Sequence, residues 1–356
     1  MRSDPFIGCL LGTAVGDALG LPYEGLPPGR ARKMFPDATK HHLLLGRGMV
    51  SDDTEHAAFV AEALVQSRGD IDVFRQRLAS SLRWWLLALP AGVGFATLRS
   101  IIKLWCGVPP QRSGVKSAGN GPAMRSAILG IAFGHDGQRL CEYVKASTEI
   151  THRDPKAYYA ALGVAIAAID VVCVDDADWQ ADYLHSLTLL MPEEAACEFH
   201  ELSKRAMRSA EKGESLTQFA ESIGSHDGIS GYCYHTVPAV LQVWFRLGDD
   251  FEQGLAEIIR AGGDTDTAGA IFGAIVGARR GRAGIPPAWL EGIIDWPRSM
   301  AWLERLGSAV ADSLEPGRPA VRLPRYFWPG ILPRNLLFLA IVLLHGVRRL
   351  LPPYGG

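Results

Sequence analysis

Residues 8–20 read GCLLGTAVGDALG, with glycine at positions 8, 12, 16 and 20. Gly269, Gly273 and Gly277 repeat this spacing near the other end of the chain. Residues four apart share one face of an α-helix, so each glycine ladder makes a smooth stripe against which another backbone packs closely. Such stripes also occur in membrane helices, but neither ladder is long or apolar enough to span. Because glycine costs a helix about 1 kcal/mol relative to alanine, the ladders predict close packing at the centre of a soluble core.

Helical periodicity dominates the other apolar segments. Residues 55–66, for example, are rich in alanine and leucine and contain no β-branched run, which favours a helix. No segment shows several short strands separated by turn signals. The sequence therefore predicts an all-α fold, with helices at 55–66, 157–174, 236–246, 251–261 and 268–280.

The overall charge gives no reason to expect a nucleic-acid partner. Lys and Arg number 36 and Asp and Glu number 38 among the 356 residues, so the formal net charge is −2. Nucleic-acid-binding domains usually carry a basic field that this composition lacks. The six cysteines include no CxxC pair, which favours a reduced, cytoplasmic protein with buried thiols. Thr13 and Asp17 interrupt the first apolar segment, which makes it a poor signal peptide.

Two short acidic motifs are the strongest chemical signal in the chain. Residues 51–54 read SDDT and residues 262–267 read GGDTDT, each directly before a predicted helix. One acid or hydroxyl is enough to cap a helix, so capping is the alternative interpretation. Each motif instead has two acids plus hydroxyls, and four such carboxylates brought together would repel one another unless cations lay between them. The all-oxygen donor set predicts Mg²⁺ or Mn²⁺ in place of Zn²⁺.

Two other interpretations of residues 264–267 depend on spacing. An EF-hand loop would need ligands at Ala268 and Ile275, which excludes it. A phosphatase of the haloacid dehalogenase type would need a hydrophobic strand before Asp264, where the chain has AGG. The phosphatase therefore stays only as a remote alternative.

These motifs together resemble the ADP-ribosylglycohydrolase family, the family of the dinitrogenase-reductase-activating glycohydrolase. The matching segments are GxxxGxAxGDALGxPxE at 8–24, SDDTE at 51–55, GNGPAMR at 119–125, THRDP at 151–155 and GGDTDT at 262–267. The resemblance covers about residues 8–280. It implies a compact orthogonal multi-helix bundle with two Mg²⁺ or Mn²⁺ ions in a cleft, which cleaves the bond at the anomeric carbon of ADP-ribose. It also implies an ADP-ribosylated protein as substrate and ADP-ribose as product.

The resemblance also implies a role for individual residues. The metal ligands would be Ser51, Asp52, Asp53, Asp264, Asp266 and Thr267. Glu24 matches an acid beside the metals, and either Glu24 or a ligand carboxylate such as Asp53 or Asp264 would orient or deprotonate the attacking water. The ADP-ribose would contact Gly92, Gly94, Thr97, Asn120, Gly121, His152 and Tyr232. Asp17 stays open between a partner to the metal ligands and a helix-packing acid.

Two departures from the family pattern bear on the acceptor, the amino-acid side chain to which the ADP-ribose is attached. Some arginine-directed members have an acid where this chain has Gly92, and some serine-directed members have a tyrosine where it has Ala118. Tyr232 or Tyr234 would then supply the ring that stacks on adenine. We expect arginine-linked ADP-ribose to be cleaved, with toxin immunity as one cellular role. The alternative from another class is a non-catalytic ADP-ribose-binding protein that inhibits a partner by occlusion.

The last segment differs in character. We assign 1–312 to the catalytic domain and 313–356 to a C-terminal segment, basic and proline-rich at first and then apolar at 336–344. Nine apolar residues are too few to span a membrane, which needs about twenty. We expect a helix that docks on the domain or on a partner protein, with a peripheral membrane contact through Arg348 and Arg349 as the alternative. Because every motif lies upstream, removal of the segment after about Ser313 is expected to spare the metal site.

Overall fold

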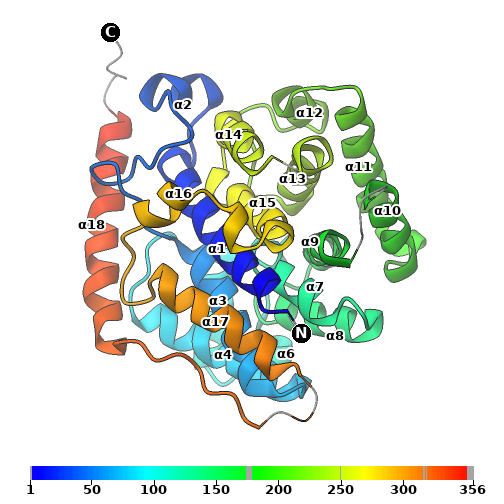
Figure 1. The fold of residues 1–356 in the computed structure, drawn as a ribbon, viewed down its shortest axis with the longest axis vertical. Coiled ribbons are helices and arrows are strands. Elements are labelled where there is room, and N and C mark those ends of the chain that lie inside the picture. Colours follow the sequence, from blue (N-terminus) through cyan, green and yellow to red (C-terminus); the bar gives the residue numbers. More distant parts are fainter. Residues whose placement is uncertain (1, 174–178, 249, 316, 318, 351–356) are drawn as a thin grey trace.

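The computed structural model describes residues 2–173, 179–248, 250–315, 317 and 319–350, and within them the ordered elements are helices (Figure 1). The α-helices are α1 (Asp4–Gly20), α2 (Pro28–Met34), α3 (Asp52–Ser67), α4 (Ile71–Leu87), α5 (Phe95–Trp105), α6 (Pro110–Ser113), α7 (Ala127–Phe133), α8 (Gly137–Glu149), α9 (Pro155–Cys173), α10 (Trp179–Leu190), α11 (Glu193–Glu211), α12 (Leu216–Ser222), α13 (Cys233–Leu247), α14 (Phe251–Ala261), α15 (Thr265–Arg280), α16 (Pro287–Gly292), α17 (Met300–Ser313) and α18 (Ile331–Leu350). Short 3₁₀ turns are η1 (Leu21–Tyr23), η2 (Ala123–Arg125), η3 (Arg282–Gly284) and η4 (Trp328–Gly330). The all-α prediction is confirmed.

The centre of the fold is the antiparallel pair α1 and α15, and the two glycine ladders face each other across it (Figure 1). A Cβ atom on Gly8, Gly12 or Gly16 would overlap a carbonyl oxygen of α15, and one on Gly273 or Gly277 would overlap a carbonyl oxygen of α1. The matched pairs are Gly8 with Gly277, Gly12 with Gly273, and Gly16 with Gly269. The predicted close packing is therefore confirmed, and the partner of each ladder is the other ladder.

The remaining helices surround this pair. α3, α7 and α17 pack against α1, while α9, α13 and α14 pack against α15. Large side chains such as Trp244, Trp302 and Phe6 fill the space between these layers and are almost fully buried. The five predicted helices all fall within observed ones, except that Val174 lies outside the described residues. The expected burial of the thiols is wrong in part, because Cys106 and Cys197 are exposed.

The C-terminal helix α18 stands along one edge of the molecule (Figure 1). The prediction that its apolar segment is too short to span a membrane was wrong, because the apolar stretch Trp328–Arg349 is long enough by length and composition alone. The prediction that the first glycine ladder is too short or too polar to span was also wrong by the same measure, because Asp4–Tyr23 is long and apolar enough. This stretch is 94% buried and belongs to the core. Phe338 and Ile341 pack α18 against Leu43 and Met49, whereas its outer leucines face solvent.

Substitution at the glycine contact should destabilise the fold strongly. In Gly12→Ala the new methyl group would overlap the backbone of α15, and backbone yields less readily than a side chain. We expect a loss of about 3 kcal/mol or more of unfolding free energy, measured by denaturant titration. Gly346→Ala on α18 is the matched control, since its Cβ would meet nothing within 4 Å. Equal stability of Gly12→Ala and wild type would contradict the packing argument.

Candidate active site

The first acidic motif is held at the amino end of α3 by hydrogen bonds within the motif. Ser51 is the N-cap, and its Oγ accepts a hydrogen bond from the Asp53 amide at 3.3 Å. The same hydroxyl donates to Asp53 Oδ2 at 3.1 Å. Capping therefore does occur, as the alternative interpretation required, but Ser51 alone supplies the cap. The carboxylates of Asp52 and Asp53 remain available for another purpose.

The carboxylate of Asp17, on α1, holds this motif in place through hydrogen bonds. It accepts hydrogen bonds from the Ser51 amide at 2.9 Å, the Thr54 amide at 3.2 Å and the Thr54 hydroxyl at 2.5 Å. Complete burial raises the pKa of Asp17 to about 6, although these hydrogen bonds lower it. This answers the open question about Asp17: its hydrogen bonds position the first acidic motif, whose residues are predicted metal ligands.

The second motif begins at a tight turn that only glycine adopts readily. Gly262 and Gly263 have positive φ angles of 69° and 82°, a region that side chains disfavour. Gly263 pairs with Leu26 on one side and Ile229 on the other, and a Cβ atom on it would overlap the Ile229 backbone. Helix α14 leads into this turn, whereas the phosphatase alternative required a strand, so that alternative is excluded.

The structure brings the two motifs into contact although they are more than two hundred residues apart. Thr267 Oγ1 donates a hydrogen bond to Asp53 Oδ2 at 3.3 Å. Asp53 Oδ1 and Asp266 Oδ1 are both buried without a hydrogen-bond partner. Such an atom normally costs about 1–3 kcal/mol or more, so two of them in one place indicate a ligand that supplies positive charge.

Electrostatics agree with this interpretation. Burial raises the pKa of Asp52, Asp53 and Asp266 well above the ordinary value, and repulsion from neighbouring carboxylates raises each further. The donors are carboxylate and hydroxyl oxygens, which suit Mg²⁺ or Mn²⁺. Among the described residues, no group of three or more His, Cys, Asp or Glu side chains is arranged to hold a metal ion. Hydroxyls, water or substrate would have to complete the coordination.

Glu24 lies on an exposed turn beside the second motif. It follows η1, and the next residue, Gly25, donates its amide to the Gly263 carbonyl at 2.7 Å. Although the side chain of Glu24 is exposed, the protein around it partly desolvates the carboxyl and so raises its pKa. The charge of Asp264 raises the pKa further, and Arg349 lowers it. The structure thus brings Glu24 and the second motif together, as the sequence motifs led us to expect.

The loop with Gly92 and Gly94, which the resemblance assigns to contact with ADP-ribose, precedes α5. Gly92 and Gly94 are exposed, and a Cβ atom on either would meet nothing within 4 Å. Thr97 in the first turn of α5 is buried, and its hydroxyl lies 3.9 Å from the position of a Cβ atom on Gly121. The loop is therefore adjacent to the GNG loop at 119–121, with its backbone open to solvent.

The GNG loop packs against two other predicted site segments, those that contain His152 and Tyr232. Gly119 pairs with Tyr232, and the ring of His152 lies so close that a side chain at Gly119 or Gly121 would crowd it. Burial lowers the pKa of His152 to about 3, so its ring is neutral near pH 7. His152 is only 3% exposed and therefore supports the loop from beneath.

Asn120 has a contact that the sequence did not reveal. Its Nδ2 donates to Asp264 Oδ2 at 2.7 Å and to Thr236 Oγ1 at 3.0 Å. The amide therefore orients an acid of the second motif, in addition to any contact with a ligand. Of the two candidate stacking rings, Tyr234 is buried, whereas Tyr232 is half-buried and its hydroxyl accepts a hydrogen bond from Lys156 at 2.9 Å.

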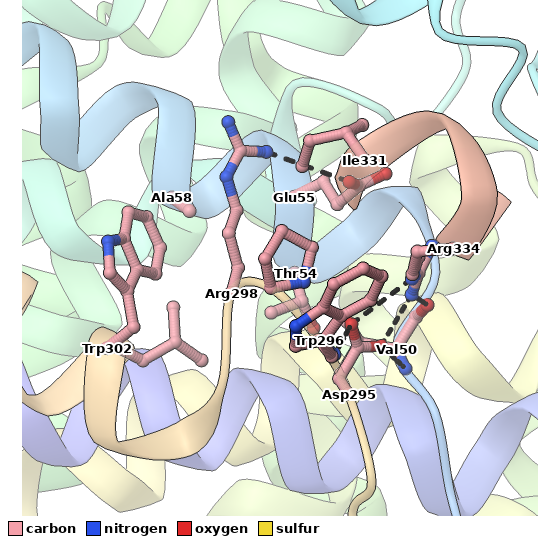
Figure 2. Close-up of a pocket in the computed structure, with 12 residues that line it drawn as sticks. Val50, Thr54, Glu55, Ala58, Asp295, Trp296, Arg298, Trp302, Ile331 and Arg334 are labelled. Atoms are coloured by element: carbon pink, nitrogen blue, oxygen red, sulfur yellow. Dashed lines mark hydrogen bonds and ion pairs between the residues drawn. The ribbon is translucent and has the colours of Figure 1, made fainter. Parts of the chain in front are cut away.

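Sequence reasoning missed an ion pair behind the first motif, shown in Figure 2. Arg334 of α18 pairs with Asp295 at 2.5 Å, and both side chains are nearly fully buried. Arg334 also donates to the Val50 carbonyl, and Asp295 accepts from the Val50 amide at 3.0 Å. Val50 directly precedes Ser51. The signal for this contact in the sequence was the pair Arg334 and Asn335, two adjacent polar residues in an otherwise apolar segment. These contacts argue against the expectation that loss of the tail would spare the site.

The structure thus combines an all-helical fold with acidic motifs clustered at the amino ends of two helices. The chain belongs to the ADP-ribosylglycohydrolase family, whose model matches residues 1–319. It is 28% identical to the ADP-ribosyl-[dinitrogen reductase] glycohydrolase of Rhodospirillum rubrum over 81% of this chain and 90% of that protein.

Two further comparisons agree. The chain is 26% identical to the ADP-ribosylarginine hydrolase Tri1 of Pseudomonas putida, with 80% of this chain and 72% of that protein covered. A solved structure described as an ADP-ribosylglycohydrolase-related protein complex has a TM-score of 0.65 and 28% identity, over 88% of this chain and 99% of that one. The predicted family and enzyme class are confirmed.

The raised pKa of Asp53 leads to a prediction for the metal-free protein. A carboxyl whose pKa is raised by folding costs stability above that pKa, and this cost disappears as pH falls toward the unfolded value near 4. In EDTA, Asp53→Asn should therefore melt a few degrees above wild type at pH 8, and the difference should shrink toward pH 5. Comparing the two proteins at each pH cancels the titration of the buried histidines. A lower melting temperature for the variant at pH 8 would contradict the proposed repulsion.

Proposed function

We propose that this protein hydrolyses the bond between ADP-ribose and an arginine side chain of a modified protein, with two Mg²⁺ or Mn²⁺ ions held by the two acidic motifs. The observation that carries the metal proposal is the contact between the motifs, where buried Asp53 and Asp266 oxygens lack hydrogen-bond partners. The proposed ligands are Ser51, Asp52, Asp53, Asp264, Asp266 and Thr267.

The chemistry divides between the ions and the protein. When bound, the ions would neutralise the carboxylates, fix the ribose hydroxyls and make a water more acidic. Asp17 and Asn120 orient the ligand carboxylates through the hydrogen bonds described above. Hydrolysis adds the water oxygen to the anomeric carbon, breaks the bond to the guanidino nitrogen and returns a proton to that nitrogen. Glu24, with its raised pKa beside the second motif, would accept the proton of the water.

ADP-ribose would extend from this centre toward the glycine loops. The exposed backbone at Gly92 and Gly94 precedes α5, where amide groups at a helix amino end suit phosphate oxygens. The adjoining GNG loop and the half-buried ring of Tyr232 would continue the surface toward adenine. Toxin immunity remains a prediction about the cellular role.

The arginine acceptor is supported by the likeness to the ADP-ribosylarginine hydrolase from P. putida. Gly92 stands at the position where an acid would contact the guanidinium of the arginine acceptor, and glycine has no side chain to make that contact. Acceptor preference would then come from weaker contacts on other loops. A lost charged hydrogen bond corresponds to roughly 1.5–3 kcal/mol, or about ten- to a hundredfold in rate.

Metal dependence is the first test. EDTA should abolish release of ADP-ribose from an ADP-ribosylated protein, and Mg²⁺ or Mn²⁺ should restore it. Asp264→Asn should keep the helical circular dichroism spectrum yet lower turnover by about a hundredfold or more. Asp182→Asn, the same chemical change on exposed α10, is the matched control. Full wild-type activity in EDTA would refute the two-metal proposal.

Substrate recognition provides the second test. Calorimetry in Mg²⁺ should show that free ADP-ribose binds, because the matched motifs are all proposed to contact that part of the substrate. Rates on arginine-linked peptides should exceed those on serine-linked peptides. Undetectable ADP-ribose binding would overturn the function, a serine-only preference would overturn the acceptor alone, and binding without turnover would favour the non-catalytic alternative.

A further inference from the structure

The last described turn of α18 contacts the segment that carries Glu24. Arg349 donates hydrogen bonds from Nη1 to the Glu24 carbonyl at 2.7 Å and from Nη2 to the carbonyls of Pro22 and Leu21 at 3.1 and 3.3 Å. One guanidinium therefore holds three carbonyl oxygens within four residues. The last carbonyl groups of a helix have no hydrogen-bond partner within the helix, so a side chain such as arginine can satisfy them. The positive charge of an arginine there also interacts favourably with the negative end of the helix dipole.

Arg349 is itself fixed in place. Arg30 of α2 donates to its carbonyl oxygen, and one turn earlier His345 contacts the Leu43 carbonyl. Phe338 and Ile341 bury the inner face of α18 farther along. The guanidinium therefore extends from a docked helix, which makes it a firm support for an exposed turn.

The Glu24 turn is also held on its other side, by Gly263 and by the buried side chains of Tyr23 and Leu26. Gly25, with a φ of 70°, lets the chain reverse after Glu24, and its amide bonds to the Gly263 carbonyl at 2.7 Å. The Glu24 amide bonds to the Leu21 carbonyl at the long distance of 3.3 Å. These bonds hold the side of the turn that faces Gly263, whereas Arg349 holds the carbonyl of Glu24 itself.

We propose that Arg349 is a positioning residue: it fixes the Glu24 turn beside the second acidic motif, so that α18 completes the active site. This inference rests on the proposed function for its kinetic consequence. It does not require Arg349 to touch the substrate, since its hydrogen bonds go to backbone carbonyls. A direct role in binding ADP-ribose phosphate is the competing explanation.

The test compares Arg349→Ala with Arg348→Ala in the full-length protein. Both variants remove one positive charge from the same turn of α18, but the Arg348 guanidinium lies over the Phe35 ring, whereas that of Arg349 binds the Glu24 carbonyl. In Arg349→Ala, hydrogen exchange of residues 21–26 should accelerate by about tenfold, with the other core helices unchanged. Turnover should fall by about tenfold and KM should stay within about twofold. Arg348→Ala should match wild type in both measurements.

A double variant separates positioning from binding. If Arg349 acts through Glu24, then Glu24→Gln/Arg349→Ala should turn over no more slowly than Glu24→Gln alone. A raised KM at unchanged turnover would assign Arg349 to substrate binding and overturn the proposal. Unchanged exchange at residues 21–26 would overturn it whether or not the protein is active. If wild type releases no ADP-ribose, the proposed function fails, and the exchange experiment still decides whether Arg349 holds the turn.

Discussion

Backbone-to-backbone packing of α1 against α15 is the constraint on which the rest of the molecule depends. Because the helices are antiparallel, the end of α1 lies beside the beginning of α15, and Thr265 donates to the Gly20 carbonyl at 2.9 Å. This places Asp17 and the Glu24 turn next to the second acidic motif. The distance between these groups is therefore set by main chain, which is less adaptable than a contact between long side chains.

The same constraint forces acidic groups together. Asp17, Asp53 and Asp266 are buried at the junction of three helices, where each raises the free energy of its ionised neighbours. Hydroxyls and amides offset part of that charge, and the charges of Arg334 and Arg349 attract Asp17 and Asp266. The surrounding supports, Asn120 on one motif and the Arg334–Asp295 pair behind the other, keep the acids from moving apart. A site built in this way would be preorganised for the proposed cations at a cost in stability.

The sequence predicted much of this arrangement because its signals are local. Glycine ladders indicate a close helix contact, and paired acids before a helix indicate a charged site. The sequence could not predict which distant residues pair in the fold. Nothing in residues 119–121 shows that Asn120 bonds to Asp264, because that contact joins residues 144 positions apart. The tail was predicted in part: α18 docks on the domain as expected, but its polar contacts were not foreseen. Arg334 and Arg349 stood in the sequence as basic residues near an apolar segment, and only their partners show that α18 supports the acidic motifs.

The glycine seam also bears on how the chain acquires its structure. α1 is synthesised first, yet the helix that covers it follows about 250 residues later. Neither ladder is a strong helix former alone, so the central pair is expected to gain its stability only from their late encounter. Such long-range contacts slow folding, because a large loop must close before they form. During synthesis the apolar N-terminal segment would stay unprotected until most of the domain had emerged, which makes this stage the most exposed to misassembly and to capture by chaperones.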